Sequence, residues 1–356
     1  MSVVKVTIIL KVNNSFRNRE LWKRDLRLML VSGFFGVMVG VMNSFLHEDI
    51  LIWNALTGAL TGMVTSLCIT SVELHVFARY LRRTRFLVAV FIRTVYYTVT
   101  VTFWLTMSYG FEQFLKSHHF QIEIDRSFYV MALLILVVAF LLNVYVMLNR
   151  LLGRRVLGYF LTGKYHRPVE EERVFMFLDI QGSTQIAEQL GDLRYQDFLN
   201  DFFYDITGSI LRSHGEIYKY VGDAVIVSWP VKLGVKQGNC LKCCKSIYEV
   251  FQHVEGRYQQ KYGLVPKYRI GLHGGPVVAA EIGDNKREIA FLGDTVNTAA
   301  RLQEECKVQG VECLISGDLF QRIHAQPDGR WFQWARIGDV KLRGKEQDTE
   351  LIRVWF

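Results

Sequence analysis

The sequence predicts an N-terminal all-α membrane domain of four helices, followed by a C-terminal α+β domain. Three observations support this division. Long apolar segments with at most one charged side chain are confined to the first 150 of the 356 residues. Beyond residue 172, short apolar runs of strand length alternate with longer segments of helical periodicity. Half of all residues are hydrophobic and 21% are charged, a composition that excludes a disordered or collagen-like chain.

Four segments are long enough to cross a bilayer as helices, which takes about 20 residues each. They comprise residues 28–46, 51–72, 86–109 and 127–148, and together they form the predicted membrane domain over 28–148. Arg93 is the one charged side chain within them. Because it lies about two turns from one end of its span, we expect its long side chain to extend back to the membrane interface.

Basic residues flank these spans at three places, and such residues favour the cytoplasmic side of a membrane. The other two connections are poor in them, since 47–50 has none and 110–126 has two against three acids. We therefore expect a multi-pass protein of the inner (plasma) membrane, with a cytoplasmic segment over 1–27, both termini in the cytoplasm and a cytoplasmic C-terminal domain. The three basic flanks are Arg17, Arg19, Lys23, Arg24 and Arg27; Arg79, Arg82, Arg83 and Arg85; and Arg150, Arg154 and Arg155.

Residues 149–172 read as a connector, basic at first and acidic at its end. Its apolar residues between Leu151 and Phe160 have the spacing of an amphipathic helix that continues from the last span, and Pro168 would end that helix. The predicted C-terminal domain then occupies 173–356.

The C-terminal domain begins with an almost continuously apolar strand over 173–180. Helical spacing over 183–212 follows, and then two strands on either side of a Gly222-Asp223 turn. The later predicted elements are a helix over 236–262, a strand from Tyr268, a short strand over 288–292, a helix that opens at Gly293, and strands near 311–315, 336–342 and 349–355.

Two carboxylates in this domain suggest a metal site. Asp179 ends an apolar strand, and Asp223 lies in the tight turn between two apolar strands. An Asp at a turn is most often a cap, but two carboxylates beside glycine-containing turns suit Mg²⁺, which binds one or two carboxylates together with phosphate oxygens. The turn containing Gly182, Ser183 and Thr184 then opens a helix, and the free N–H groups of a helix start suit a phosphate.

Four ordered motifs in this domain, FLDIQGST (177–184), KYVGDAVIV (219–227), GLHGGPVVAAEIG (271–283) and FLGDTVNTAARL (291–302), resemble the catalytic domain of class III nucleotidyl cyclases. The resemblance covers about residues 170–356 and leaves the membrane half uncovered. It implies a ferredoxin-like, palm-type α+β catalytic domain, here in a membrane-anchored enzyme of bacterial type.

The resemblance assigns metal binding to three positions. Asp179 and Asp223 match the two metal-binding aspartates of the family, and the carbonyl of Ile180 matches a further ligand. Two Mg²⁺ ions per site are implied, with Mn²⁺ as an alternative, and they would clamp the triphosphate while the ribose 3′-hydroxyl attacks the α-phosphorus.

The family's transition-state residues fall on the helix that opens at Gly293. Asn297 matches the residue that orients the ribose, and Arg301 matches the residue that stabilises charge at the α-phosphate; four residues apart, they share one helix face. Arg343 matches a phosphate-binding lysine, although Lys341 and Lys345 lie near enough in sequence to compete for that role.

The base-reading positions match the family only in part. Lys219 matches the lysine that donates to adenine, whereas guanylate cyclases have an acid there. The second purine-reading position is three residues before Gly293 and holds Ala290, where adenylate cyclases usually have Asp, Thr or Ser. Ala290 offers no side-chain hydrogen bond, so we expect looser adenine discrimination or a backbone contact.

The resemblance therefore implies an adenylate cyclase that converts ATP to 3′,5′-cyclic AMP and pyrophosphate. Family sites lie between two catalytic domains, so a homodimer is implied, with ATP and the lipid bilayer as further partners and no nucleic-acid partner expected. The alternatives are a guanylate cyclase, disfavoured by Lys219, and a non-catalytic cyclase-like membrane receptor. The receptor is disfavoured because Asp179, Asp223, Asn297 and Arg301 are all present.

Overall fold

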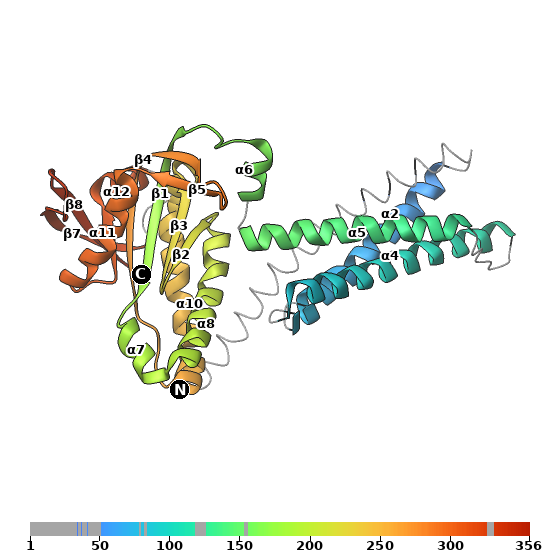
Figure 1. Ribbon diagram of the computed structural model, residues 1–356, viewed down its shortest axis with the longest axis horizontal. Helices are drawn as coiled ribbons and strands as arrows, with labels where there is room; N and C mark the ends of the chain where they lie inside the picture. The colour runs from blue at the N-terminus through green and yellow to red at the C-terminus, as the bar shows by residue number, and fades with distance from the viewer. Residues whose placement is uncertain are drawn as a thin grey trace. The chain divides into compact units, whose positions relative to one another are not determined.

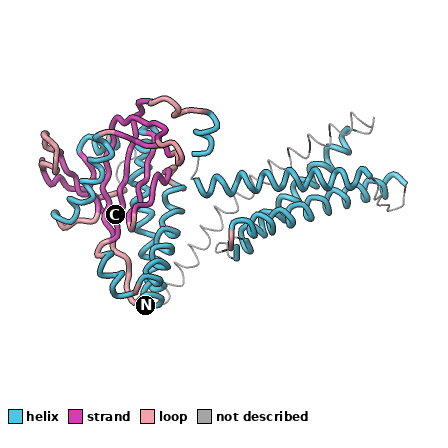
Figure 2. The backbone as a smooth tube through the Cα atoms, viewed as in Figure 1, coloured by secondary structure: helices cyan, strands magenta, loops and turns pink. Residues whose placement is uncertain are grey.

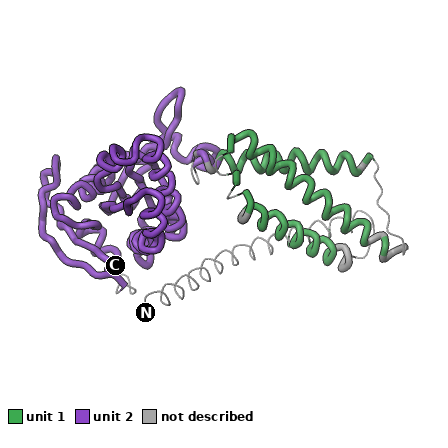
Figure 3. The backbone as a smooth tube through the Cα atoms, turned by 90° about the horizontal axis from the view of Figure 1, so that it is seen from below, with its two compact units in different colours: residues 1–148 green, residues 149–356 purple. Residues whose placement is uncertain are grey.

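The computed structural model describes residues 34, 37, 41, 51–77, 80–81, 84–117, 126–152, 156–325 and 331–356. The chain divides into two compact units, residues 1–148 and 149–356, which Figure 3 shows in different colours. The division falls at the start of the predicted connector.

The first unit contains three helices that are long and apolar enough to cross a membrane. They are α2 (Leu51–Val72), which continues into the π-helix η1 (Glu73–Phe77), α4 (Phe86–Ser117) and α5 (Arg126–Leu152). These helices correspond to three of the four predicted spans, and α4 and α5 continue beyond them. The span predicted for 28–46 lies outside the described residues apart from Phe34, Val37 and Val41, so the described part of the chain has three such helices rather than four.

Arg93 is buried in the first unit and is paired with a residue directly beyond the end of α2. It is only 5% exposed, and its Nε donates to Oε2 of Glu73 at 3.1 Å. Tyr97 donates its hydroxyl to the same oxygen at 2.9 Å. Because Glu73 lies in the π-helix, directly after α2, a partner for the charge is available inside the helix bundle.

The second unit is built on one eight-stranded sheet, which confirms the predicted α+β class. The strand order is β2-β3-β1-β4-β6-β8-β7, and β5 pairs with β4 (Figure 1). The pairs are antiparallel except for β4 with β6. The strands are β1 (Val169–Ile180), β2 (Glu216–Val221), β3 (Ala224–Pro230), β4 (Tyr268–Ile282), β5 (Glu288–Leu292), β6 (Cys313–Ser316), β7 (Gln333–Val340) and β8 (Thr349–Trp355).

Helices pack on both faces of this sheet; Figure 2 shows the helices in cyan and the strands in magenta. The main ones on one face are α8 (Asp192–Arg212) and α10 (Asn239–Tyr262), and their buried aromatic residues pack on Val174, Met176, Leu178 and Ile180 of β1. The helix predicted over 183–212 is divided into α7 (Ser183–Leu190) and α8, because Gly191 adopts φ 72° between them. The remaining helices are α9 (Val231–Val235), η3 (Lys236–Gly238), α12 (Gly317–His324) and, on the opposite face, α11 (Asp294–Val308). Of these, α9 and α12 were not predicted, and η3 is the start of the helix predicted over 236–262.

The opposite face of the sheet carries a second apolar cluster. Phe175 of β1, Ile226 of β3 and Phe291 of β5 belong to it, and so does Tyr165 from the connector. The connector contains a short helix, α6 (Val156–Thr162), which packs on the same cluster, and the carbonyl of Tyr165 accepts a hydrogen bond from N–H of Glu281 at 2.9 Å. The end of the predicted connector is therefore an integral part of the second unit.

Candidate active site

Asp179 and Asp223 come together where β1 and β2 end and β3 begins. Side chains alternate along β1, so Asp179 lies on the face of Phe175 and Phe177, while Ile180 is buried in the helix-side core. Asp179 pairs with Ala224 of β3, the residue after Asp223, and Gly222 allows the tight turn through φ 61°. The strand register thus places the two predicted metal-binding carboxylates side by side.

The charge of the Asp223 carboxylate acts on its neighbour Asp179. Burial and the neighbouring Asp223 carboxylate raise the pKa of Asp179 to about 6. The side-chain amide of Gln303 on α11 opposes this rise by donating to Oδ2 of Asp179 at 3.3 Å. Mutual repulsion of this kind favours a bound cation.

The chemistry of these donors fits a hard divalent cation. Among the residues that the structure describes, no group of three or more His, Cys, Asp or Glu side chains is gathered. Two carboxylates and the carbonyl of Ile180 are a suitable set for Mg²⁺, which takes oxygen ligands and completes its shell with water and substrate phosphate.

The turn after β1 lies next to this pair. Gly182 adopts φ 69° and precedes α7, which begins at Ser183 without a side-chain cap. Tyr195 of α8 lies near this turn, where burial, followed by the charge of Asp223, raises its pKa and Ser183 lowers it. Sequence reasoning missed Tyr195, because only the packing of α8 beside the turn brings it here. Thr184 is exposed on the same turn.

A β-bulge determines where Lys219 lies. Ile217 pairs with Val227, but Lys219 pairs with Ile226, so Tyr218 is the extra residue. Ile226 and Tyr218 both belong to the second apolar cluster. Lys219 therefore lies on the same face as Tyr218, whereas strict alternation would have turned it toward the helices.

Lys219 forms an ion pair with Glu288 of β5, a residue that was not among the predicted site residues. Its Nζ lies 2.6 Å from Oε2 of Glu288, and the second oxygen of Glu288 pairs with Lys286 at 2.7 Å. Ala290, the second predicted base-reading residue, lies two positions further along β5 and is buried.

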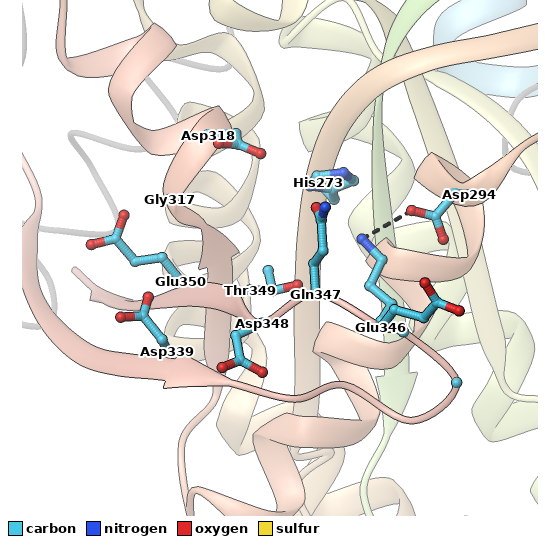
Figure 4. Close-up of a pocket in the computed structure, with 12 residues that line it drawn as sticks. His273, Asp294, Gly317, Asp318, Asp339, Glu346, Gln347, Asp348, Thr349 and Glu350 are labelled. Carbon is cyan, nitrogen blue, oxygen red and sulfur yellow. Dashed lines mark ion pairs between the residues drawn. The ribbon is translucent and has the colours of Figure 1, made fainter.

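Helix α11 holds the two predicted transition-state residues. Asn297 is exposed and Arg301 is half-buried. The guanidinium of Arg301 lies against Gly344, because a Cβ added to that glycine would approach Nη2 to 3.4 Å. Arg343 is exposed beside this contact, whereas the competing Lys345 pairs with Asp294 at 2.9 Å (Figure 4).

A cavity of about 540 Å³ adjoins this loop but does not suit a triphosphate. His273 and Asp294 border it, and Figure 4 shows carboxylates on several sides of it. A lining of this charge repels phosphate. Its acidic residues are Asp294, Asp318, Asp339, Glu346, Asp348 and Glu350.

The predicted residues thus form groups rather than one cluster within a single chain. Asp179 and Asp223 are together, and Lys219 is joined to β5. Lys219 lies on β2, two positions before the strand ends at Val221, and Asp223 lies in the turn that follows. Gln303 links the carboxylate pair to α11, the helix that carries Asn297 and Arg301.

Known proteins share this unit. The family model for the adenylate and guanylate cyclase catalytic domain matches residues 167–353. Adenylate cyclase 2 of Rhizobium meliloti is 45% identical over 204 residues, which are 57% of this chain and 55% of that protein. An uncharacterized protein of Mycobacterium tuberculosis is 31% identical over 179 residues, 49% of this chain and 31% of that protein. The chain therefore spans about half the length of the first of these relatives and about a third of the second.

Solved structures share the fold. A bacterial light-regulated adenylyl cyclase superposes with a TM-score of 0.53 at 19% identity, covering 65% of this chain and 66% of that one. At this level of identity the superposition concerns the fold alone.

Proposed function

Because the chain belongs to the adenylate and guanylate cyclase catalytic-domain family, we propose that it is a membrane-bound adenylate cyclase that converts ATP to 3′,5′-cyclic AMP and pyrophosphate. One observation carries the proposal beyond the family match. Asp179 and Asp223 stand side by side at one end of β2, while the bulge turns Lys219, further along the same strand, toward β5. A site for a nucleoside triphosphate needs at least one group of residues that binds the metal-bound phosphates and another that binds the base.

Three groups of this chain would hold divalent cations: the carboxylates of Asp179 and Asp223, and the carbonyl of Ile180. When bound, two Mg²⁺ ions, or Mn²⁺ in their place, supply Lewis-acid stabilisation of the triphosphate and activation of the ribose 3′-hydroxyl. The residues themselves fix where the α-phosphate lies. N–H groups of the turn at Gly182, Ser183 and Thr184 contribute hydrogen-bond donors to the phosphates.

Residues of α11 and of the loop beside it would position the ribose and stabilise the charge that develops on the phosphates. The amide of Asn297 would orient the ribose, and Arg301 would neutralise charge that develops at the α-phosphate. The Arg301 guanidinium lies beside Gly344, whose lack of a Cβ leaves room for it next to this loop. Arg343, exposed beside this contact, would bind the departing phosphates.

Lys219 would donate a hydrogen bond to the adenine ring. This preference for adenine distinguishes the proposed adenylate cyclase from the first alternative, a guanylate cyclase. A guanylate cyclase would need an acceptor at the position of Lys219. The second alternative, a non-catalytic membrane receptor, is disfavoured because the carboxylate pair and both α11 residues remain in place.

The active site is proposed to be shared by two chains. One chain would supply Asp179 and Asp223, and its partner would supply Lys219, Asn297 and Arg301. The pairing of Lys219 with Glu288 of β5, rather than with either carboxylate of the metal-binding pair, supports this arrangement.

The proposed position of the chain in the membrane is based on the predicted membrane-spanning segments. We place residues 28–148 in the bilayer of the inner membrane, with 1–27, the connector 149–172 and the catalytic domain 173–356 on the cytoplasmic side. The three helices of the described residues that are long and apolar enough support the membrane association.

A direct assay tests the proposal. The detergent-solubilised full chain is incubated with ATP or GTP and with Mg²⁺ or Mn²⁺, and the product is identified by mass spectrometry. Cyclic AMP from ATP is expected. Cyclic GMP as the main product would favour the guanylate cyclase, and no cyclic nucleotide under any condition would favour the receptor.

A further inference from the structure

We propose that Glu288 reads the 6-amino group of adenine in this chain, taking the role that Ala290 has no side chain to perform. The inference rests on the proposed adenylate cyclase activity. It makes Glu288 a residue that determines which base is accepted.

The first support is the contact with Lys219. The two side chains come from strands that are not hydrogen-bonded to each other, and 69 positions separate them in the sequence. Nζ of Lys219 nevertheless lies 2.6 Å from Oε2 of Glu288. The proposed base donor therefore has a carboxylate acceptor directly beside it.

The second support is the register of β5. Side chains alternate along a strand, so Glu288 and Ala290 lie on the same face, about 7 Å apart. Ile289 and Phe291 occupy the other face and pack in the second apolar cluster. Glu288 is the acidic side chain on the face of Ala290, and it is longer than the Asp, Thr or Ser expected at position 290.

The carboxylate also has acceptor capacity left. An ionised carboxylate offers about four acceptor positions, and Lys219 and Lys286 occupy one on each oxygen. These two lysines lower the pKa of Glu288 to about 2, so it is ionised at neutral pH. An ionised acceptor that retains free positions can bind an amino group.

The chemistry of the purine edge makes this pair discriminating. Adenine has an amino donor at C6 and an acceptor at N1, whereas guanine has an acceptor at C6 and a donor at N1. With Lys219 donating to N1, a carboxylate at C6 attracts the adenine amino group and repels the guanine oxygen. Stability is a poor alternative explanation for the pair, because ion pairs this exposed, with side chains 39% and 33% accessible, contribute little.

The test compares ATP with purine riboside triphosphate, which lacks only the 6-amino group. The full chain in detergent is assayed for kcat/KM with both substrates. Wild type is expected to prefer ATP roughly tenfold to hundredfold, and Glu288→Ala to reduce that preference to within about threefold. If the alanine variant does not fold, Glu288→Met replaces it in the test, because Met keeps the side-chain length without the oxygens. The same reduced preference for ATP is expected of it.

Three further variants sharpen the result. Glu281→Ala removes a carboxylate from the paired strand of the same hairpin, and Lys286→Ala removes the other lysine from Glu288; both should keep the wild-type preference. Adding Ala290→Thr to Glu288→Ala should restore part of it, because a hydroxyl returns at the expected position.

The outcomes separate the two proposals. If Glu288→Ala lowers kcat/KM equally for both substrates, Glu288 only orients Lys219 and the inference is overturned. It is also overturned if wild type does not distinguish the substrates. If wild type forms no cyclic product from ATP, the proposed function itself fails.

Discussion

The side-chain amide of Gln303 donates to Oδ2 of Asp179 at 3.3 Å, across 124 positions of sequence. This bond ties α11, which carries Asn297 and Arg301, to the carboxylate pair at the end of β1. It is possible because α11 packs closely on β4: a Cβ on Gly271 would come within 2.2 Å of the backbone nitrogen of Gln303.

Removing this bond should weaken the metal site without dismantling it. In Gln303→Leu, Asp179 loses a donor that lowers its pKa, so protons compete better with the cation. We expect the Mg²⁺ concentration for half-maximal cyclisation to rise roughly tenfold at pH 7, and by more at lower pH. Gln309→Leu is the matched control, because the amide of Gln309, the residue directly after α11, binds the neighbouring Glu305 side chain at 2.7 Å. Equal metal requirements in the two variants would contradict a positioning role for Gln303.

A second prediction concerns the buried Arg173. It is 1% exposed, pairs with Glu171 at 3.1 Å and Glu216 at 2.8 Å, and stacks on the Phe291 ring at 4.5 Å. Arg173→Met leaves two shielded carboxylates without this partner, so we expect a loss of about 3 kcal/mol in the free energy of unfolding of the second unit. That corresponds to a fall of about 6 to 12 °C in its unfolding temperature.

The buried cysteines of the second unit report this change. Cys240, Cys243, Cys244, Cys306 and Cys313 are inaccessible in the fold, so a thiol-reactive dye follows unfolding of this unit in the full chain. Arg336→Met serves as the control, since Arg336 is 57% exposed and its ion pairs should contribute about 0 to 1 kcal/mol. If the two variants lowered the unfolding temperature by similar amounts, the burial of Arg173 and its partners would not explain their contribution to stability.

A third prediction concerns pH and His273, which borders the acidic cavity. Burial, and then the charge of Lys345, lowers its pKa to about 4, while Asp318 and Asp294 act in the opposite direction and Arg322 adds to the decrease. The unfolded chain binds a proton at this residue near pH 6.5 and the folded chain does not, so this contribution to stability is present above pH 6.5 and is lost as the pH falls toward 4.

Between pH 7 and pH 5 the loss should be about 2 kcal/mol, or about 4 to 8 °C in the unfolding temperature of the second unit. His273→Asn cannot titrate and should show a correspondingly smaller decrease over the same range. His253→Asn, at an exposed position of α10, should behave as wild type. The assignment to His273 fails if its replacement leaves the pH dependence unchanged.

The sequence predicts best those features that depend on neighbouring residues. The strands around Gly222-Asp223 follow from apolar runs and a turn that needs a glycine, and the strand register then brings Asp179 beside Asp223. Residues 51–72 are predicted as a span and form α2 with the same limits, because the uncharged apolar run ends at Glu73, where the π-helix begins.

Features that depend on distant contacts are not predicted. Alternation alone would direct Lys219 toward the helices, and only the bulge at Tyr218 brings it to Glu288. Arg93 finds Glu73 because a π-helix follows α2, a conformation with no sequence signal of its own. The burial of Tyr165 likewise depends on Phe291, a residue far along the chain.

The last prediction tests whether the site is shared between chains. A double variant, Asp179→Asn with Asp223→Asn, lacks the carboxylate charges, and Arg301→Ala lacks the guanidinium; each should form inactive homodimers that still fold. In a mixed dimer, one interface combines both defects, whereas the other joins an intact carboxylate pair to an intact Asn297 and Arg301. Random co-expression should therefore restore about a quarter of wild-type activity, and mixed dimers purified through two different tags about half. Wild-type dimers carrying the same two tags calibrate the assay. If mixed dimers of demonstrated composition are inactive, each site is built within one chain. In that case the intact carboxylate pair of one chain and the intact Asn297 and Arg301 of the other cannot combine into a working site.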